Sequence, residues 1–185
     1  MPTRSDAVVV GTTAPVRSAD ARVVGGCEST AAAVTATLGA AIATLPDEAG
    51  TSVPVLVLAD AYSRWAARRF ARRCADPARR LRPSDSTGLE TSELLRKFAI
   101  ASGWRGPCYL LAGSDAAEFL ETGRAFAATG PVVLCEVAPL DTDALDDPGC
   151  TVTAVVLTGA DSVLDIPQAP PGALLAAAGS AGGRG

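Results

Sequence analysis

The most promising position for catalytic or ligand-binding residues in this sequence is the run Gly113, Ser114 and Asp115. The apolar residues 108–112 before them are typical of a buried strand, and residues 115–128 after them carry a helical pattern. A strand that turns sharply into a helix brings unpaired N–H groups and the positive end of the helix dipole together, where enzymes place nucleophiles and bind anions. The chain contains no histidine. The sequence therefore predicts the scaffold of a catalytic turn without its usual chemistry.

Asp115 has two interpretations at this turn. As the N-cap of the helix, its carboxylate would accept hydrogen bonds from unpaired backbone N–H groups, and Ser114 is equally suited to that role. As a general base or substrate-positioning acid, it would need a partner residue, and none can be named. Capping is the favoured interpretation.

Five cysteines are spread along the chain: Cys27, Cys74, Cys108, Cys135 and Cys150. They form no CxxC pair and have no histidine nearby, so free thiols are favoured over disulfides or a zinc site. Cys108 and Cys135 lie in strand-like runs and are interpreted as core thiols rather than nucleophiles. Cys27 follows two glycines and precedes a helix, a position that would lower the pKa of its thiol.

Length and composition favour one globular α/β domain. The 185 residues are 48% apolar, and the net charge of −4 argues against nucleic acid as a partner. No apolar run is long enough to span a membrane and none resembles a signal peptide, so we expect a cytoplasmic protein with no membrane partner. Residues 1–165 are expected to form the domain. Residues 166–185, rich in Pro, Ala and Gly, are expected to be disordered.

Short apolar strands alternate with helices along the chain, which favours an α/β sheet covered on both faces. The expected strands are 7–11, 53–59, 108–112, 132–137 and 151–158. The expected helices are 28–45, 90–102 and 115–128, and residues 83–88 are expected to form a loop.

Residues 64–82 form a strongly basic segment that holds eight of the 16 basic residues. On a helix, Trp65, Phe70 and Cys74 would lie roughly in line and leave the arginines on a broad exposed face. A solvated helix face is one interpretation. A second is a surface that recognises carboxylates or phosphates, since guanidinium groups suit both.

The residues Phe98-Ala-Ile-Ala-Ser-Gly-Trp-Arg-Gly-Pro-Cys-Tyr109, with the turn and helix behind them, resemble the β-ketoacyl synthases of the thiolase superfamily. The resemblance covers roughly residues 7–160 in pattern and spacing. It implies an α/β fold, namely a layered thiolase-like half-fold with a mixed sheet and covering helices. In that family the turn carries a catalytic cysteine nine residues after the glycine that matches Gly106, which is the position of Asp115. The family's two catalytic histidines belong to a C-terminal half that we expect this chain to lack.

The resemblance implies a degenerate, non-catalytic partner or accessory subunit in fatty-acid or polyketide biosynthesis. It implies a homo-oligomer or a heteromer with a ketosynthase-type subunit, and an acyl carrier protein as a further partner. No resident cofactor is implied, although a carrier protein would bring its phosphopantetheine group to the surface. The carrier protein is expected to dock on Arg68, Arg69, Arg72 and Arg73. The subunit interface is expected to include Cys108, Leu110, Phe119, Val133 and Cys135.

Two other functions stay open at this stage. The first is a small acyltransferase or ketosynthase-like enzyme with a cysteine nucleophile, for which Cys108 is the candidate; a covalent acyl adduct would identify it. The second is a Rossmann-like binding module unrelated to acyl chemistry, which monomeric behaviour without a carrier or ketosynthase partner would favour. No metal site is expected.

Overall fold

The computed structural model of the chain describes residues 8–12, 27–45, 52–87, 89–113, 115–139, 141–145 and 150–158. Within them lie five strands and five helices in the order β1 (Val8–Thr12), α1 (Cys27–Ile42), β2 (Val55–Leu58), α2 (Asp60–Cys74), α3 (Pro83–Thr87), α4 (Glu93–Ser102), β3 (Cys108–Leu111), α5 (Ala116–Ala127), β4 (Val132–Pro139) and β5 (Cys150–Leu157).

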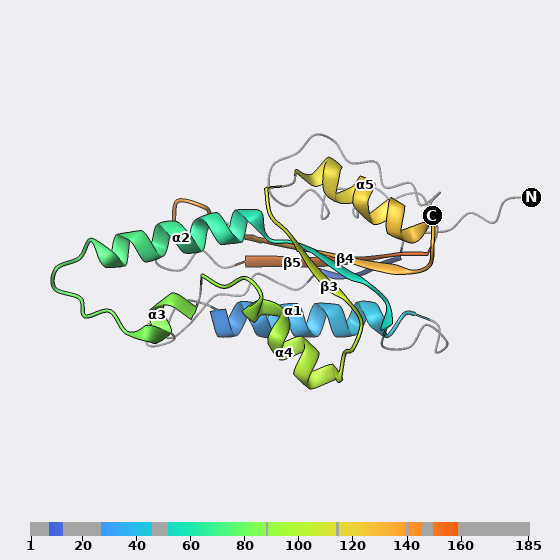
Figure 1. Ribbon diagram of the computed structural model, residues 1–185, viewed down its shortest axis with the longest axis horizontal. Coiled ribbons are helices and arrows are strands. Elements are labelled where there is room, and N and C mark those ends of the chain that lie inside the picture. Colours follow the sequence, from blue (N-terminus) through green and yellow to red (C-terminus); the bar gives the residue numbers. More distant parts are fainter. Residues whose placement is uncertain are drawn as a thin grey trace, which may run out of the picture.

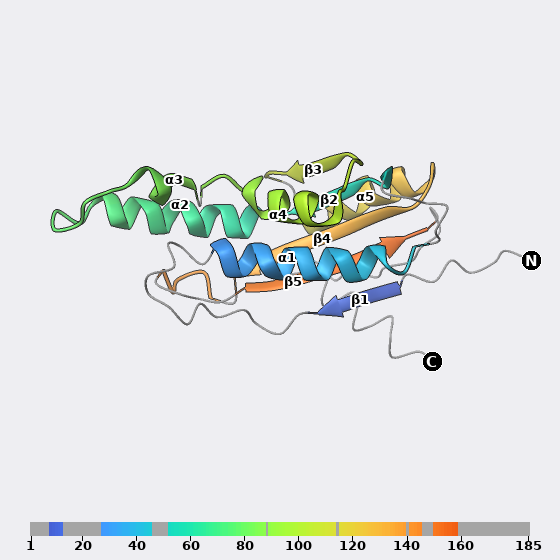
Figure 2. The same cartoon turned by 90° about the horizontal axis from the view of Figure 1, so that it is seen from below.

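One mixed sheet organises these elements, with the strand order β1-β5-β4-β2-β3. The strands β3, β2 and β4 are parallel, with Leu56 of β2 in register with Tyr109 of β3 and Leu134 of β4. The strand β5 runs antiparallel to β4, and β1 runs antiparallel to β5. Figure 2 shows β1 and β3 on opposite sides of the molecule. The predicted α/β fold with a mixed sheet and covering helices is confirmed.

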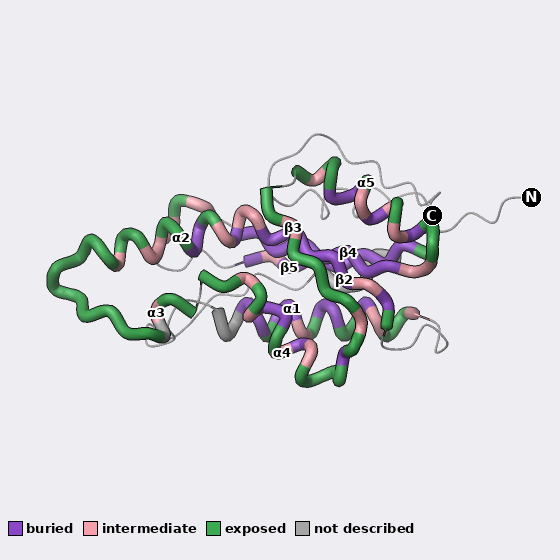
Figure 3. The backbone as a smooth tube through the Cα atoms, viewed as in Figure 1, coloured by how far each residue is buried: buried purple, intermediate pink, exposed green. Residues whose placement is uncertain are grey.

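Helices cover the two faces of the sheet unequally (Figure 1). Residues alternate along each strand, so Val55 and Val57 pack toward α1, α2 and α4, while Leu56 and Leu58 pack toward α5. The first face forms the larger core, which contains Tyr62 and Trp65 of α2 and Phe98 of α4. Figure 3 shows the resulting contrast between the buried central strands β2, β4 and β5 and the exposed strand β3.

The basic segment differs from the prediction. The helix α2 ends at Cys74, and residues 83–87, predicted as a loop, form the short helix α3. Pro77 follows Asp76 directly, and a residue that precedes proline disfavours helical geometry, so α2 stops before this pair. Pro83 begins α3, where a missing N–H costs nothing because the first N–H groups of a helix have no partner within it. The predicted tail, residues 166–185, and Ser114 lie outside the described residues.

Candidate functional site

The predicted turn begins at a closely packed approach to β3. Gly103 has φ +64° and ends α4, as the sequence predicts from a glycine after the last helical residue. Three residues later, Gly106 lies against the backbone of Ser52 and Val53, with no room for a side chain. The carbonyl oxygen of Pro107 then accepts the N–H of Val55 at 3.0 Å. The Gly-Pro pair therefore seats β3 beside β2.

The turn after β3 is hydrogen-bonded to Asp60, which lies just after the neighbouring strand β2. Gly113 has φ +73°, a conformation that glycine adopts without strain. Its N–H donates to the Asp60 carboxylate at 3.3 Å, and Asp60 also forms an ion pair with Arg64 within α2. The carboxyl ends of β2 and β3 thus meet, as expected for adjacent parallel strands.

Asp115 is the N-cap of α5. Its backbone is extended, and its Oδ1 accepts the N–H of Glu118 at 2.9 Å. This is the capping geometry that the sequence predicts, with a carboxylate satisfying an unpaired N–H at the positive end of a helix. The side chain is exposed to solvent. Asp115, which the resemblance matches to the nucleophile position of ketosynthases, is therefore a helix cap in this structure.

Burial disfavours the thiolate form of two cysteines near the turn, Cys108 and Cys135. Cys108, interpreted from the sequence as a core thiol, is instead exposed on β3. Partial burial raises the pKa of its thiol, while a hydrogen bond with the Trp104 side chain acts in the opposite direction, and the thiol lies 3.9 Å from the carbonyl oxygen of Gly106. Cys135 is buried in β4, where burial and the nearby Glu136 raise its pKa to about 12. Cys150 is buried as well, and Cys74 is exposed at the end of α2. The side chain of Cys27 lies outside the described residues.

The strand β3 forms an open edge of the sheet. Among the described strands it pairs with β2 alone, and Cys108, Tyr109 and Leu110 are exposed. The Tyr109 ring packs on Phe126 of α5, with 5.4 Å between the ring centroids. An unpaired edge with exposed apolar side chains is a template for a further strand.

The predicted interface residues divide into two groups. Cys108 and Leu110 are on this open edge and are accessible to a partner. Phe119, Val133 and Cys135 are fully buried inside the chain, with Phe119 and Val133 on opposite faces of the sheet. These three side chains belong to the core of the chain, so they are not accessible to a partner.

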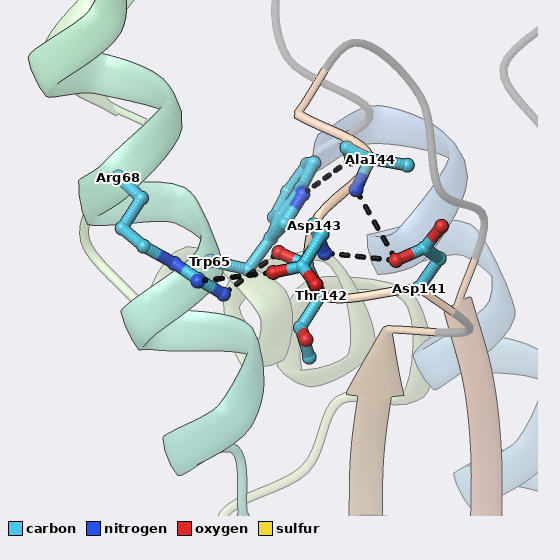
Figure 4. Close-up of polar contacts among 6 residues, drawn as sticks. All are labelled: Trp65, Arg68, Asp141, Thr142, Asp143 and Ala144. Atoms are coloured by element: carbon cyan, nitrogen blue, oxygen red, sulfur yellow. Dashed lines mark hydrogen bonds and ion pairs between the residues drawn. The ribbon is translucent and has the colours of Figure 1, made fainter.

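The arginines predicted to dock a carrier protein are engaged in contacts within the chain. Arg68 donates to the carbonyl oxygen of Thr142 at 2.7 Å and lies 3.5 Å from the Asp143 carboxylate (Figure 4). Arg69 lies over the Trp65 ring, 5.2 Å from its centroid. Arg73 is paired with Asp85 of α3. Arg72 is exposed on α2 but also has an interaction within the chain.

The loop after β4 packs on α2, a contact that sequence reasoning missed. The Trp65 indole N–H donates to the carbonyl oxygen of Ala144 at 3.0 Å, and Asp141 accepts the N–H groups of Asp143 and Ala144 (Figure 4). The Asp-Thr-Asp run is typical of a turn in which an aspartate side chain accepts the backbone N–H of the second residue after it. The turn itself could therefore have been predicted from the local sequence. Its contact with Trp65, 79 residues away in the sequence, could not.

The described part of the chain holds no group of three or more potential metal ligands. In the same residues, no helix has the length and apolar character that crossing a membrane requires.

No family model matches the chain, and no curated protein matches it in sequence. Among solved structures, the chain is similar to one chain of the complex between a ketosynthase, ApeO, and its chain length factor, ApeC, from Xenorhabdus doucetiae. The TM-score is 0.50 at 13% sequence identity, and the match covers 96% of this chain and 93% of that chain. The fold is ketosynthase-like. The two coverages also mean that this ketosynthase-like chain and its structural neighbour are of similar length.

Proposed function

We propose that this ketosynthase-like chain is a non-catalytic subunit of fatty-acid or polyketide biosynthesis that pairs with a ketosynthase-type protein. The observation that carries the proposal is the open edge at β3, where Cys108, Tyr109 and Leu110 are exposed beside a turn whose Asp115 serves as a helix cap. An exposed apolar edge favours a protein partner. The structural neighbour is a complex of a ketosynthase with a chain length factor, which supports a partner of the ketosynthase type.

The residues at the turn support the non-catalytic part of the proposal. A condensing reaction of the ketosynthase type needs a thiolate to take the acyl chain and a base to assist it. Asp115 cannot form a thioester, and the chain contains no histidine. Cys108 is the nearest thiol in sequence, but its raised pKa disfavours the thiolate.

Pairing is tested by co-expressing the chain with a ketosynthase-type protein encoded in the same genome and measuring the mass of the purified complex by light scattering. We expect a stable complex, and we expect Leu110→Lys to weaken it about tenfold, because a charge on an edge strand opposes strand addition. Ile100→Lys is the matched control, since Ile100 is an exposed apolar residue on helix α4 and not on the edge strand. A monomer that binds no such protein would instead favour a binding module unrelated to acyl chemistry.

The lack of catalysis is tested separately by incubating the chain with an acyl-thioester and recording its intact mass. We expect no covalent adduct. A stoichiometric adduct that disappears in Cys108→Ala would show that the chain is an acyltransferase and would overturn the non-catalytic part of the proposal.

A further inference from the structure

The C-terminal part of α2, the loop 75–82 and α3 form an arm that extends beyond the end of the sheet (Figure 1). The segment from Arg64 to Arg82 that runs into this arm contains eight of the 16 basic residues and a single acidic one, Asp76. The rest of the chain therefore carries a large excess of acidic residues. This separation makes the arm the basic pole of an acidic protein.

The shape of the arm is fixed by its two aspartates. Asp85 lies in α3, and its Oδ1 is 3.2 Å from the Arg73 guanidinium while its Oδ2 accepts the N–H of Arg82 at 2.8 Å. The side chains of Arg73 and Asp85 are only 12% and 9% exposed, so water screens this ion pair weakly. Asp76 accepts the N–H of Ala78 at 3.0 Å and shapes the start of the loop.

Three arginines at the end of the arm are left without such partners. Arg79, Arg80 and Arg82 are exposed, and within the described residues their guanidinium groups make no hydrogen bond or ion pair. Leu81 lies between two of them and is 42% exposed. Arg105, just before β3, is likewise exposed, and its guanidinium group makes no hydrogen bond or ion pair among the described residues. In contrast, the exposed Arg64 and Arg96 and the half-buried Arg124 each pair with an acidic residue on their own helix.

We propose that the loop formed by residues 79–82 is a preorganised docking site for an acidic surface of a protein partner. Guanidinium groups bind carboxylates through paired hydrogen bonds, and Leu81 offers an apolar contact among them. The acidic remainder of the chain repels anions elsewhere on the surface, so an acidic ligand is expected to bind at the arm and not along the rest of the chain.

The arm and β3 lie along the same side of the molecule, opposite β1 (Figure 2). A protein bound at the β3 edge therefore lies on the same side of the molecule as the arm and can contact it. We take this protein to be the ketosynthase-type subunit that pairs with β3, which rests on the proposed function. Contacts at such a rim act mainly on the rate of association.

Binding of fluorescently labelled poly-L-glutamate to the full chain tests the loop without any ketosynthase. We expect neutralisation of the loop, in the triple variant Arg79→Gln, Arg80→Gln and Arg82→Gln, to weaken binding about tenfold. The control is Arg64→Gln, Arg96→Gln and Arg124→Gln, which changes the net charge equally and is expected to leave binding within about twofold. Equal losses in the two variants would overturn the proposal.

Asp85→Asn separates preorganisation from simple charge. This variant makes the chain more positive, so charge alone would tighten the binding of poly-L-glutamate. We expect binding about threefold weaker instead, because the loop loses the carboxylate that holds Arg73 and the N–H of Arg82. Tighter binding would show that the loop is not preorganised.

Two further measurements separate this proposal from the proposed function. A ketosynthase-type protein that fails to bind the wild-type chain contradicts the proposed function, while the poly-L-glutamate result stands by itself. If the complex forms, the loop variant should associate about tenfold more slowly than the control variant. A single-stranded oligonucleotide that binds the same arginines more tightly than poly-L-glutamate would overturn the assignment of a protein partner.

Discussion

Gly106 lies so close to Ser52 that a Cβ atom on the glycine would come within 2.8 Å of the serine carbonyl carbon. It would also lie 2.8 Å from the carbonyl oxygen of Val53. Both neighbours are backbone atoms, which cannot rotate away as a side chain does. The glycine of the Gly-Pro pair is therefore required by the close approach of two chain segments, and this approach places β3 next to β2.

We expect Gly106→Ala to lower the free energy of unfolding by about 2 kcal/mol, because the added methyl group forces the two backbones apart. Urea denaturation followed by circular dichroism measures the change. Gly39→Ala is the control: Gly39 lies inside α1 with open space around its Cα, and alanine there should raise the free energy by about 0.5–1 kcal/mol. A destabilisation of the same size at both positions would contradict the role of the close approach.

Asp115→Ala should lower the free energy of unfolding by about 1 kcal/mol, since the N–H of Glu118 loses its acceptor at the start of α5. Asp115→Asn should retain most of the stability, because asparagine caps helices about as well as aspartate. Thermal unfolding of the two variants compares them directly. An Asp115→Ala variant as stable as the wild type would mean that the cap contributes nothing.

The buried thiol of Cys135 should make stability fall at alkaline pH. Its pKa is about 12 in the folded chain and returns to the ordinary 9.0 on unfolding, so the unfolded state releases a proton that the folded state retains. The stabilisation is complete below pH 9 and is lost as the pH rises from 9 toward 12. The free energy of unfolding should decline by about 1.4 kcal/mol per pH unit from this group.

Urea titrations at several alkaline pH values test this dependence. Cys135→Ala should remove this part of the slope, whereas Val133→Ala, a truncation two residues earlier in β4, should lower stability and leave the slope intact. Equal slopes in both variants would show that another group is responsible.

Arg68→Gln should loosen the loop formed by residues 141–145. Arg68 holds the carbonyl oxygen of Thr142 and lies beside Asp143, so its removal frees the outer part of that loop. We expect the amides of Asp143 and Ala144 to exchange hydrogen several-fold faster, while global stability changes by less than about 1 kcal/mol. Arg64→Gln, one turn earlier in α2, should leave the exchange of both amides unchanged.

The parts of the structure that could be predicted from the sequence are those with a local cause. Asp115 caps α5 and Gly103 ends α4, and each signal lies within a few residues of the feature it predicts. The apolar strands and their alternation with helices gave the fold class for the same reason. The short helix α3 was predicted as a loop because of its proline, and β3, predicted as a buried strand, is exposed.

The docking residues could not be predicted in the same way. Positive charge and the resemblance to ketosynthases predicted Arg68 and Arg73 as docking residues, but their partners, Thr142 and Asp85, lie in segments that only the folded chain brings near. Membership of a strand or helix likewise did not reveal whether Leu110 or Phe119 would be accessible. Accessibility depends on which strand ends the sheet, and strand order is a property of the tertiary fold.

The open edge at β3 also has a consequence for how much of this protein a cell can tolerate. Strand edges with exposed apolar side chains pair with other edges, including those of misfolded or excess chains. Under the proposed function, a chain made in surplus over the protein that covers β3 would be removed from solution by its own association. We therefore expect the soluble amount of this protein to follow the supply of that proposed partner, so that the scarcer of the two sets how much complex forms.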